Sequence, residues 1–144
     1  MTLRRSHILR SLAGMVVVVL LAVACDTAAN DAGLAALNTD RNANGLSSLA
    51  LDQMLQTKAQ MWAENLASQN TLYHSNLPDG ITGCWRMLGE NIGYGPSIAV
   101  IEAAYMNSPH HRANILNTQY TRSAVGVAWH GNTVFTVQEF MQPC

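Results

Sequence analysis

The chain has few charged residues, and the basic ones are unevenly placed. Only 12% of its 144 residues are charged, with eight basic side chains against nine acidic ones. Three of the eight, Arg4, Arg5 and Arg10, lie in the first 24 residues, so residues 25–144 carry a formal charge of −4. Binding to a nucleic acid backbone depends on clustered Lys and Arg. We therefore expect no nucleic acid partner.

The sequence also lacks internal repeats and any long Pro- or Ser-rich linker. These absences argue against a repeat array and against several domains joined by linkers. The length is that of one domain, which can bury about two-thirds of its unfolded surface. A single compact domain is the expected organisation.

No apolar run is long enough to cross a membrane. Residues 12–24 contain no charge, but a spanning helix needs about 20 apolar residues. The run follows basic residues and ends in Ala22-Val23-Ala24, the pattern of a secretory signal peptide before its cleavage site. We predict a signal peptide at residues 1–24 and an exported protein, held in the cell envelope or secreted.

Cys25 directly follows this cleavage site. Residues 21–25 look like a bacterial lipobox, in which the cysteine receives lipid, although Ala22 stands where leucine is usual. We expect Cys25 to be the mature N-terminus and to carry a lipid anchor, the only contact with the membrane, with plain secretion as the alternative. Residues 25–33 would then form a short tether ahead of a domain at residues 34–144.

Only three cysteines are present, so two remain once Cys25 is processed. An even pair in an oxidising compartment is expected to form a disulfide, here Cys84–Cys144. The bond would tie the last residue to a central loop. Closing a loop of tens of residues should stabilise the fold by about 2–4 kcal/mol.

Apolar residues recur with helical spacing in four segments. Residues 33–42 form the first predicted helix, and the second, capped by Asp52, has the strongest period. A third helix begins near Pro96 and a fourth at Ser108-Pro109, a common start for a helix. Trp62 lies on the apolar stripe of the second helix and is therefore predicted to be a core residue.

The C-terminal part of the chain predicts strands. Apolar residues alternate with small ones at residues 125–129, Gly131-Asn132 supplies a hairpin turn, and residues 134–140 form the returning strand. One or two further short strands are expected near Leu72 or Glu90. Helices followed by an antiparallel hairpin predict an α+β fold.

Three separated polar residues could form a metal site. His74 closes the second helical region, Glu90 lies in a predicted loop flanked by glycines, and His111 begins the last helix. Two imidazoles and a carboxylate are the ligand set of an open zinc site, in which water takes the fourth position. Spacing alone does not bring them together, and hydrogen-bonded structural histidines are the alternative.

A series of short motifs is more specific. They are Leu-Asn-x-x-Arg at 37–41, His-Ser at 74–75, Gly-Glu-Asn-Ile at 89–92, Asn-Ser-Pro-x-His-Arg-Ala-Asn-Ile-Leu at 107–116, and Val-Gly-Val-Ala at 125–128. In this order they resemble the bacterial branch of the CAP superfamily. That superfamily holds the cysteine-rich secretory proteins, the antigen 5 proteins and the pathogenesis-related 1 proteins. The resemblance extends from about residue 34 to residue 140.

The resemblance implies a three-layer α/β/α sandwich with a small antiparallel sheet, and a shallow cleft where His74, Glu90 and His111 converge. Fuller versions of the family site add a second glutamate, where this chain has Asn107-Ser108. With one carboxylate fewer, we expect weak binding of a divalent ion, best fitted by zinc. Ser108 and His110 are possible cleft contacts. We expect His110, which replaces the usual glycine, to be exposed.

Three functions remain open at this point. The resemblance favours an exported recognition domain whose cleft binds a divalent ion and a small apolar or peptide-like ligand. A metal-dependent hydrolase would use a metal-bound water with Glu90 as third ligand or general base. No nucleophile with a partner accompanies the histidines, so binding is favoured over catalysis. The third function is a structural module of the cell envelope, and no oligomeric state is indicated.

Overall fold

The computed structural model describes residues 27–144. The predicted signal peptide and Cys25 lie outside the described residues. No helix within the described part is both long and apolar enough to cross a membrane.

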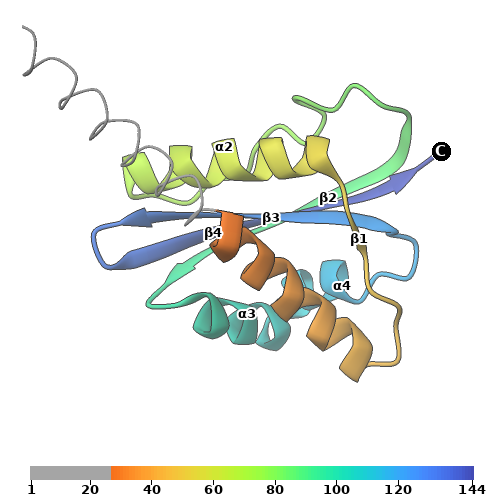
Figure 1. The fold of residues 1–144 in the computed structure, drawn as a ribbon, viewed down its shortest axis with the longest axis horizontal. Helices are drawn as coiled ribbons and strands as arrows, with labels where there is room; N and C mark the ends of the chain where they lie inside the picture. Colours follow the sequence, from red (N-terminus) through yellow and green to blue (C-terminus); the bar gives the residue numbers. More distant parts are fainter. Residues whose placement is uncertain (1–26) are drawn as a thin grey trace, which may run out of the picture.

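Helices cover both faces of a central sheet, which gives three layers (Figure 1). Helix α2 (Gln53–Gln69) lies on one face. The other face is covered by the N-terminal helix (residues 27–43), α3 (Ile98–Asn107) and α4 (Pro109–Ile115). The predicted α/β/α sandwich is confirmed.

The sheet of the described chain has four strands in the order β1-β3-β4-β2. Their bounds are β1 Ala50–Leu51, β2 Trp85–Gly95, β3 Arg122–His130 and β4 Thr133–Pro143. β4 pairs antiparallel with both β3 and β2, and the expected hairpin joins β3 to β4. The short β1 was not expected, and it pairs parallel with β3. No strand forms near Leu72.

A strand does form near Glu90, as one of the expectations had it, but β2 is long and Glu90 lies in its middle, which corrects the prediction of a loop at this residue. Its neighbours Gly89 and Gly93 are needed for close packing, not for bending the chain. A Cβ atom at Gly93 would lie 2.9 Å from the Tyr105 ring, and one at Gly89 would overlap the Tyr120 hydroxyl. Glycine-rich sequence therefore marks a strand that packs tightly against aromatic side chains.

The N-terminal helix begins earlier than expected. Residues 27–33, predicted as part of a tether, are helical and continuous with residues 34–43. Asn30 is buried, and its side-chain oxygen accepts a hydrogen bond from the Val127 N–H at 2.9 Å. Alanine is the strongest helix former, and the alanines of this segment extend the helix without adding an apolar period. The segment is packed against β3 and is part of the domain.

Helix α2 begins as the sequence predicts. The Asp52 side chain accepts hydrogen bonds from the N–H groups of Met54 and Leu55, at 3.0 and 3.1 Å. The apolar stripe packs on the sheet, with Leu55, Ala59, Ala63 and Leu66 fully buried.

Trp62 is only partly buried, so its assignment to the core was incomplete. Its ring meets Tyr73 edge-on at 5.0 Å, and its Nε1–H donates to the Tyr73 carbonyl oxygen at 3.1 Å. The indole therefore packs between the core and the segment that follows α2.

The two faces of β4 have different neighbours. Phe135 and Val137 pack with α2, whereas Val134 and Phe140 belong to the cluster that includes residues of α3, α4 and the N-terminal helix. This alternation follows from the strand geometry. Gln138 and Glu139 therefore lie on opposite faces of the sheet, and both are almost completely buried.

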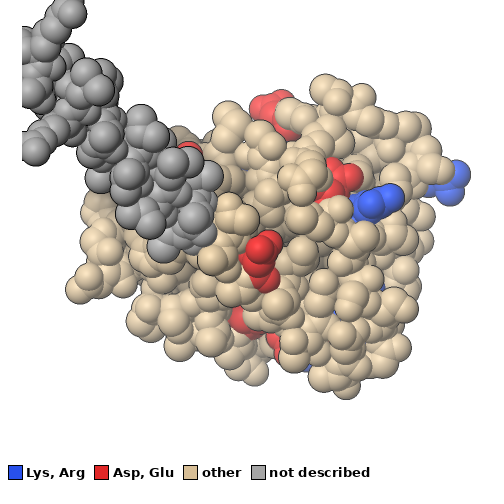
Figure 2. Space-filling model, in the orientation of Figure 1, with Lys and Arg blue, Asp and Glu red and all other residues tan. Residues whose placement is uncertain are grey.

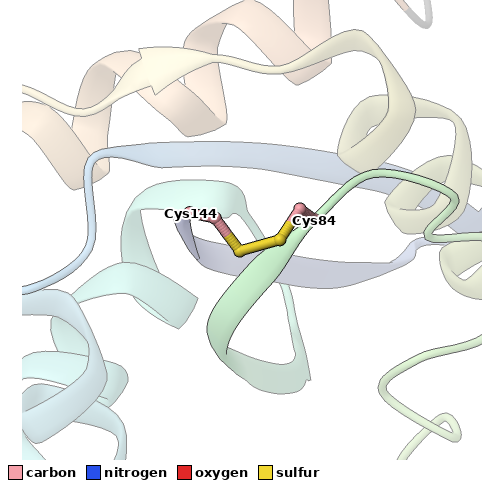
Figure 3. Close-up of a disulfide and its surroundings, with 2 residues drawn as sticks. All are labelled: Cys84 and Cys144. Atoms are coloured by element: carbon pink, nitrogen blue, oxygen red, sulfur yellow. A yellow bond between two sulfur atoms is a disulfide. The ribbon is translucent and has the colours of Figure 1, made fainter.

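The predicted disulfide is present. Cys84 lies directly before β2, Cys144 follows β4, and a bond joins their sulfur atoms (Figure 3). The Cys144 N–H also donates to the Cys84 carbonyl oxygen at 3.2 Å. The bond closes a loop with a sequence separation of 60 and holds the last residue against the sheet.

Candidate functional site

His74 and Glu90 are in direct contact. His74 Nδ1 lies 2.6 Å from Glu90 Oε1, which also accepts the Ser75 N–H at 3.0 Å. The Glu90 side chain is 1% exposed, whereas that of His74 is 61% exposed. A buried carboxylate thus fixes the orientation of a surface imidazole, whose Nε2 is the ring nitrogen available to a ligand.

His111 approaches the same edge of the sheet from α4. Its ring packs against Tyr105, with ring centroids 5.0 Å apart, and its carbonyl oxygen accepts from the Asn91 amide at 3.1 Å. Burial lowers the His111 pKa, and the electrostatic interaction with His74 and His110 lowers it further. The His111 imidazole is therefore neutral at pH 7, as a metal ligand must be.

The two possible cleft contacts differ in exposure. His110 is exposed, as expected, and Ser108 is partly buried at the N-cap of α4. The Ser108 side chain accepts no hydrogen bond from the first N–H groups of the helix. The helix instead begins with Pro109 and with the bond from the Arg112 N–H to the Ser108 carbonyl oxygen, at 2.9 Å.

His74, Glu90 and His111 do not form a three-ligand metal site in this arrangement. Across residues 27–144, no three or more His, Cys, Asp and Glu side chains are grouped so that they could hold one. The reason lies in Glu90, which is buried behind His74 and is bound to it and to the Ser75 N–H. This is the place of a carboxylate that orients a metal-binding histidine. His74 and His111 remain as two ligands, so the three-ligand centre stays a prediction.

Glu90 is also part of a buried ionic network that the sequence reasoning missed. Glu139 faces it across β2 and β4 and is 1% exposed. Lys58 Nζ lies 3.4 Å from Glu139 Oε1 and donates to the Ser75 hydroxyl at 2.7 Å. Two buried carboxyl groups thus have one lysine between them. We refer to Lys58, Glu90 and Glu139 as the carboxyl network.

A shared proton balances this network. Burial raises the pKa of Glu139 to about 9, the charge of Glu90 raises it further, and Lys58 opposes the change. Glu139 therefore keeps its proton at pH 7. Glu90 Oε2 and Glu139 Oε1 accept no hydrogen bond from another group, although Lys58 Nζ lies 3.4 Å from the latter, so the Glu139 proton can be shared between the two carboxyl groups.

Two sequence signals could have pointed to the network. Lys58 falls on the buried face of α2, one turn before Trp62, where an apolar residue would be expected. Glu139 interrupts the apolar run of β4. A charged residue in a buried pattern is retained only when it has a partner, and neither signal says which partner.

A mostly apolar groove of about 860 Å³ opens next to the network. We call it the α2 groove, and it is lined by Met54, Thr57, Lys58, Met61, Trp62, Asn65, Ser75, Asn76, Asp79 and Gly80. Met61 is 65% exposed. Lys58 and Ser75 belong both to the groove and to the hydrogen bonds around Glu139. The groove thus lies beside the His74–Glu90 pair and is not lined by His74, Glu90 or His111.

The stability of the domain is expected to depend on pH through Glu139. The pKa of Glu139 is about 9 when folded, far above its ordinary value, so the folded state holds a proton that unfolding releases. This stabilisation is complete below about pH 4.5 and is lost as the pH rises through about 9, with a slope of at most about 1.4 kcal/mol per pH unit. Urea unfolding at pH 5, 7 and 9 measures it. The difference in free energy between wild type and Glu139→Gln should shift by several kcal/mol over this range, and a constant difference would contradict the prediction.

Comparisons with known proteins agree with the geometry. The model of the cysteine-rich secretory protein family, CAP, matches residues 34–140. The uncharacterized protein YkwD of Bacillus subtilis (strain 168) is 29% identical over 104 residues, which cover 66% of this chain and 40% of that protein. The match thus spans less than half of the relative.

Two solved structures are similar over most of the chain. One is an extracellular protein containing an SCP domain from Bacillus anthracis, with a TM-score of 0.66 and 26% identity over 81% of this chain and 41% of that one. The other is an outer surface protein from Borrelia burgdorferi, with a TM-score of 0.64 and 20% identity over 77% of this chain and 90% of that one. At 20% identity the second similarity concerns the fold alone.

Proposed function

The chain belongs to the cysteine-rich secretory protein (CAP) family, and we propose that it works outside the cell as a binding domain whose α2 groove takes a small apolar or peptide-like ligand. The Bacillus anthracis relative is an extracellular protein. This location agrees with the signal peptide that the sequence predicts. The single observation that carries the proposal is the α2 groove.

The groove has the chemistry of a site for apolar groups. Its volume of about 860 Å³ lies in the range of small-molecule sites. Met54 and Met61 are flexible thioethers that adapt to different apolar shapes, and Trp62 adds a flat face. Ser75 and Lys58 give the groove a polar side that can orient a ligand. Met61 is 65% exposed, so its thioether is free to contact a ligand in the groove.

A charge placed in the α2 groove should abolish binding of an apolar probe. We expect the neutral dye N-phenyl-1-naphthylamine to gain fluorescence with wild type, and Met61→Glu to weaken its binding about tenfold, a change of about 1.4 kcal/mol. Val100→Glu is the matched control, because Val100 is 52% exposed and lies on α3, across the sheet. Fluorescence titration compares the three proteins. Equal binding by wild type and Met61→Glu would remove the α2 groove from the proposal.

We further propose that His74 and His111 bind a divalent transition ion weakly, with zinc the best fit and water completing the shell. Support comes from the neutral imidazole of His111 and from Glu90, which holds His74 by Nδ1. Weak binding follows because Glu90 stands behind His74 and adds no third donor. The fold should therefore persist in chelator, held by its core and by the disulfide.

Calorimetric titration with zinc tests this part separately. His111→Ala should abolish the binding heat, whereas His110→Gly should leave it unchanged, because His110 is exposed and lies outside the pair. Affinity should also fall below about pH 6.5, where histidine takes up a proton. If His111→Ala binds zinc as wild type does, the imidazoles are structural.

A hydrolase gains no support from the geometry. Glu90, the residue expected to be its third ligand or general base, is 1% exposed and has its Oε1 committed to His74 and to the Ser75 N–H. Lipid attachment at Cys25 stays a prediction, because Cys25 lies outside the described residues.

A further inference from the structure

We propose that Asp40 and Glu102 form a second cation site, for a hard divalent ion such as Ca²⁺, in the groove between the N-terminal helix and α3. This groove, here called the N-terminal groove, has a volume of about 480 Å³. It lies on the opposite side of the sheet from the α2 groove, and its polar lining consists of Thr39, Asp40, Glu102 and Asn107. It shares no residue with the histidine pair.

Glu102 lines this groove and has one carboxyl oxygen without a hydrogen-bond donor. The residue is 6% exposed, and its Oε2 accepts a hydrogen bond from Gln138 Nε2 at 2.6 Å. Its Oε1 is buried and has no hydrogen-bond donor. A buried acceptor without a donor is strongly unfavourable. When the proton shared with Asp40 is lost, a cation bound in the groove would take its place.

The neighbour of Glu102 in this groove is a second acidic residue, Asp40. Burial raises the pKa of Glu102 to about 8, and the Asp40 carboxyl raises it through its charge and a hydrogen bond. Arg41 does not compensate, because its guanidinium donates to the carbonyl oxygens of Ser47, Ile115 and Asn117. Unlike the carboxyl network with its Lys58, this pair is therefore left with either a shared proton or a bound cation.

The donors around the pair select the class of ion. The groove offers two carboxylates, a Thr39 hydroxyl and the Asn107 amide, and neither His nor Cys lines it. All-oxygen sites with room for water suit Ca²⁺, and two carboxylates correspond to the weak, sub-millimolar to millimolar affinity of extracellular calcium modules. On the face shown in Figure 2, acidic side chains are scattered singly, some over the α2 region and some over the region of the N-terminal helix, and basic ones lie mainly toward one edge. The residues that line the N-terminal groove include two acidic side chains and neither Lys nor Arg.

Thermal unfolding with and without CaCl₂ tests the site in the His111→Ala background, which removes the histidine pair. At pH 8 and at about ten times the dissociation constant, Ca²⁺ should raise the Tm by about 4 °C. Asp40→Asn and Glu102→Gln should each remove this response. Asp31→Asn, a change of the same charge at an exposed residue of the same helix, should keep it. Asp40 is only partly buried, so Asp40→Asn gives a result even if Glu102→Gln fails to fold.

Three outcomes would overturn the proposal: no rise in Tm with CaCl₂, a rise that persists in Asp40→Asn, or a rise equally lost in Asp31→Asn. The first, together with a Glu102→Gln protein that is more stable than its parent at pH 8, would show that a shared proton alone neutralises the pair. Zinc binding in a His111-containing protein should be unaffected by Asp40→Asn, which separates this site from the one proposed above.

Discussion

Gly126→Ala is expected to lower the free energy of unfolding by about 3 kcal/mol or more, a large part of the roughly 5–15 kcal/mol typical of a native protein. At Gly126 the backbone of α2 rests directly on β3. A Cβ atom there would overlap the carbonyl carbon and oxygen of Ala59, which are main-chain atoms inside a helix. A clash with backbone cannot be relieved by a change of rotamer, so the helix itself would have to move.

Two side-chain hydrogen bonds hold helix α2 at this distance from β3, one on each side of Gly126. Gln56 Nε2 donates to the Val125 carbonyl oxygen at 2.9 Å, and Gln60 Nε2 donates to that of Val127 at 3.2 Å. Lifting the helix would stretch these bonds and also the contact between Lys58 and Glu139. We therefore expect a loss of packing over the whole face, including a loss of dye binding in the α2 groove.

Gly83→Ala is the control, because an added Cβ atom there would meet only the Met54 methyl group at an ordinary 3.7 Å. Urea unfolding of the two variants and wild type gives the free energies. A Gly126→Ala protein within about 1 kcal/mol of wild type would mean that α2 adjusts its position freely.

Much of this architecture follows from local sequence patterns. The apolar stripe after Asp52 gave the correct start and face of α2, and alternation around Gly131-Asn132 gave the β3–β4 hairpin. These features depend on residues within a few positions of each other, where side-chain chemistry and backbone preference agree. The resemblance of the ordered motifs gave the layers of the fold.

Elements that depend on distant partners were predicted only in part. A short strand near Glu90 was one expectation, but the glycines around Glu90 also predicted a loop there. Residues 85–95 form one long strand because β4 supplies the hydrogen bonds along one edge and Tyr105 and Tyr120 pack where side chains would stand. Residues 27–33, predicted as part of a tether, are helical because the Asn30 side chain has a hydrogen-bond partner in β3. Neither partner is visible from the neighbouring sequence.

The candidate site shows the same division. His74 and Glu90 do meet, and His111 is near enough for the charge of His74 to lower its pKa. The role of Glu90 could not be predicted, because it depends on Glu139 across the sheet and on Lys58 from α2. Burial of two carboxyl groups is a property of the assembled layers, and the sequence alone does not place them within reach of one lysine.

Lys58→Met is expected to destabilise the domain by about 3 kcal/mol at pH 9. The variant keeps the volume of the side chain but removes the positive charge and the donor to the Ser75 hydroxyl and the Asn76 carbonyl oxygen. Two carboxyl groups would then share a buried space without a cation. Thr57→Met, one position earlier on an exposed face of α2, should have little effect on the free energy of unfolding.

The reason for the loss can be isolated with Glu139→Gln. A glutamine at this position carries no charge and can donate its amide to Glu90 Oε2, so the network no longer needs Lys58 for balance. In that background Lys58→Met should cost about 1 kcal/mol, which leaves a coupling energy of about 2 kcal/mol between Lys58 and Glu139. The coupling should shrink toward pH 5, because the high pKa of Glu139 already keeps that carboxyl protonated there. Urea unfolding of the four proteins at both pH values measures it. An equal effect of Lys58→Met with and without Glu139 would show that the lysine acts only through Ser75 and Asn76, and not as the counter-charge of the buried carboxyl groups.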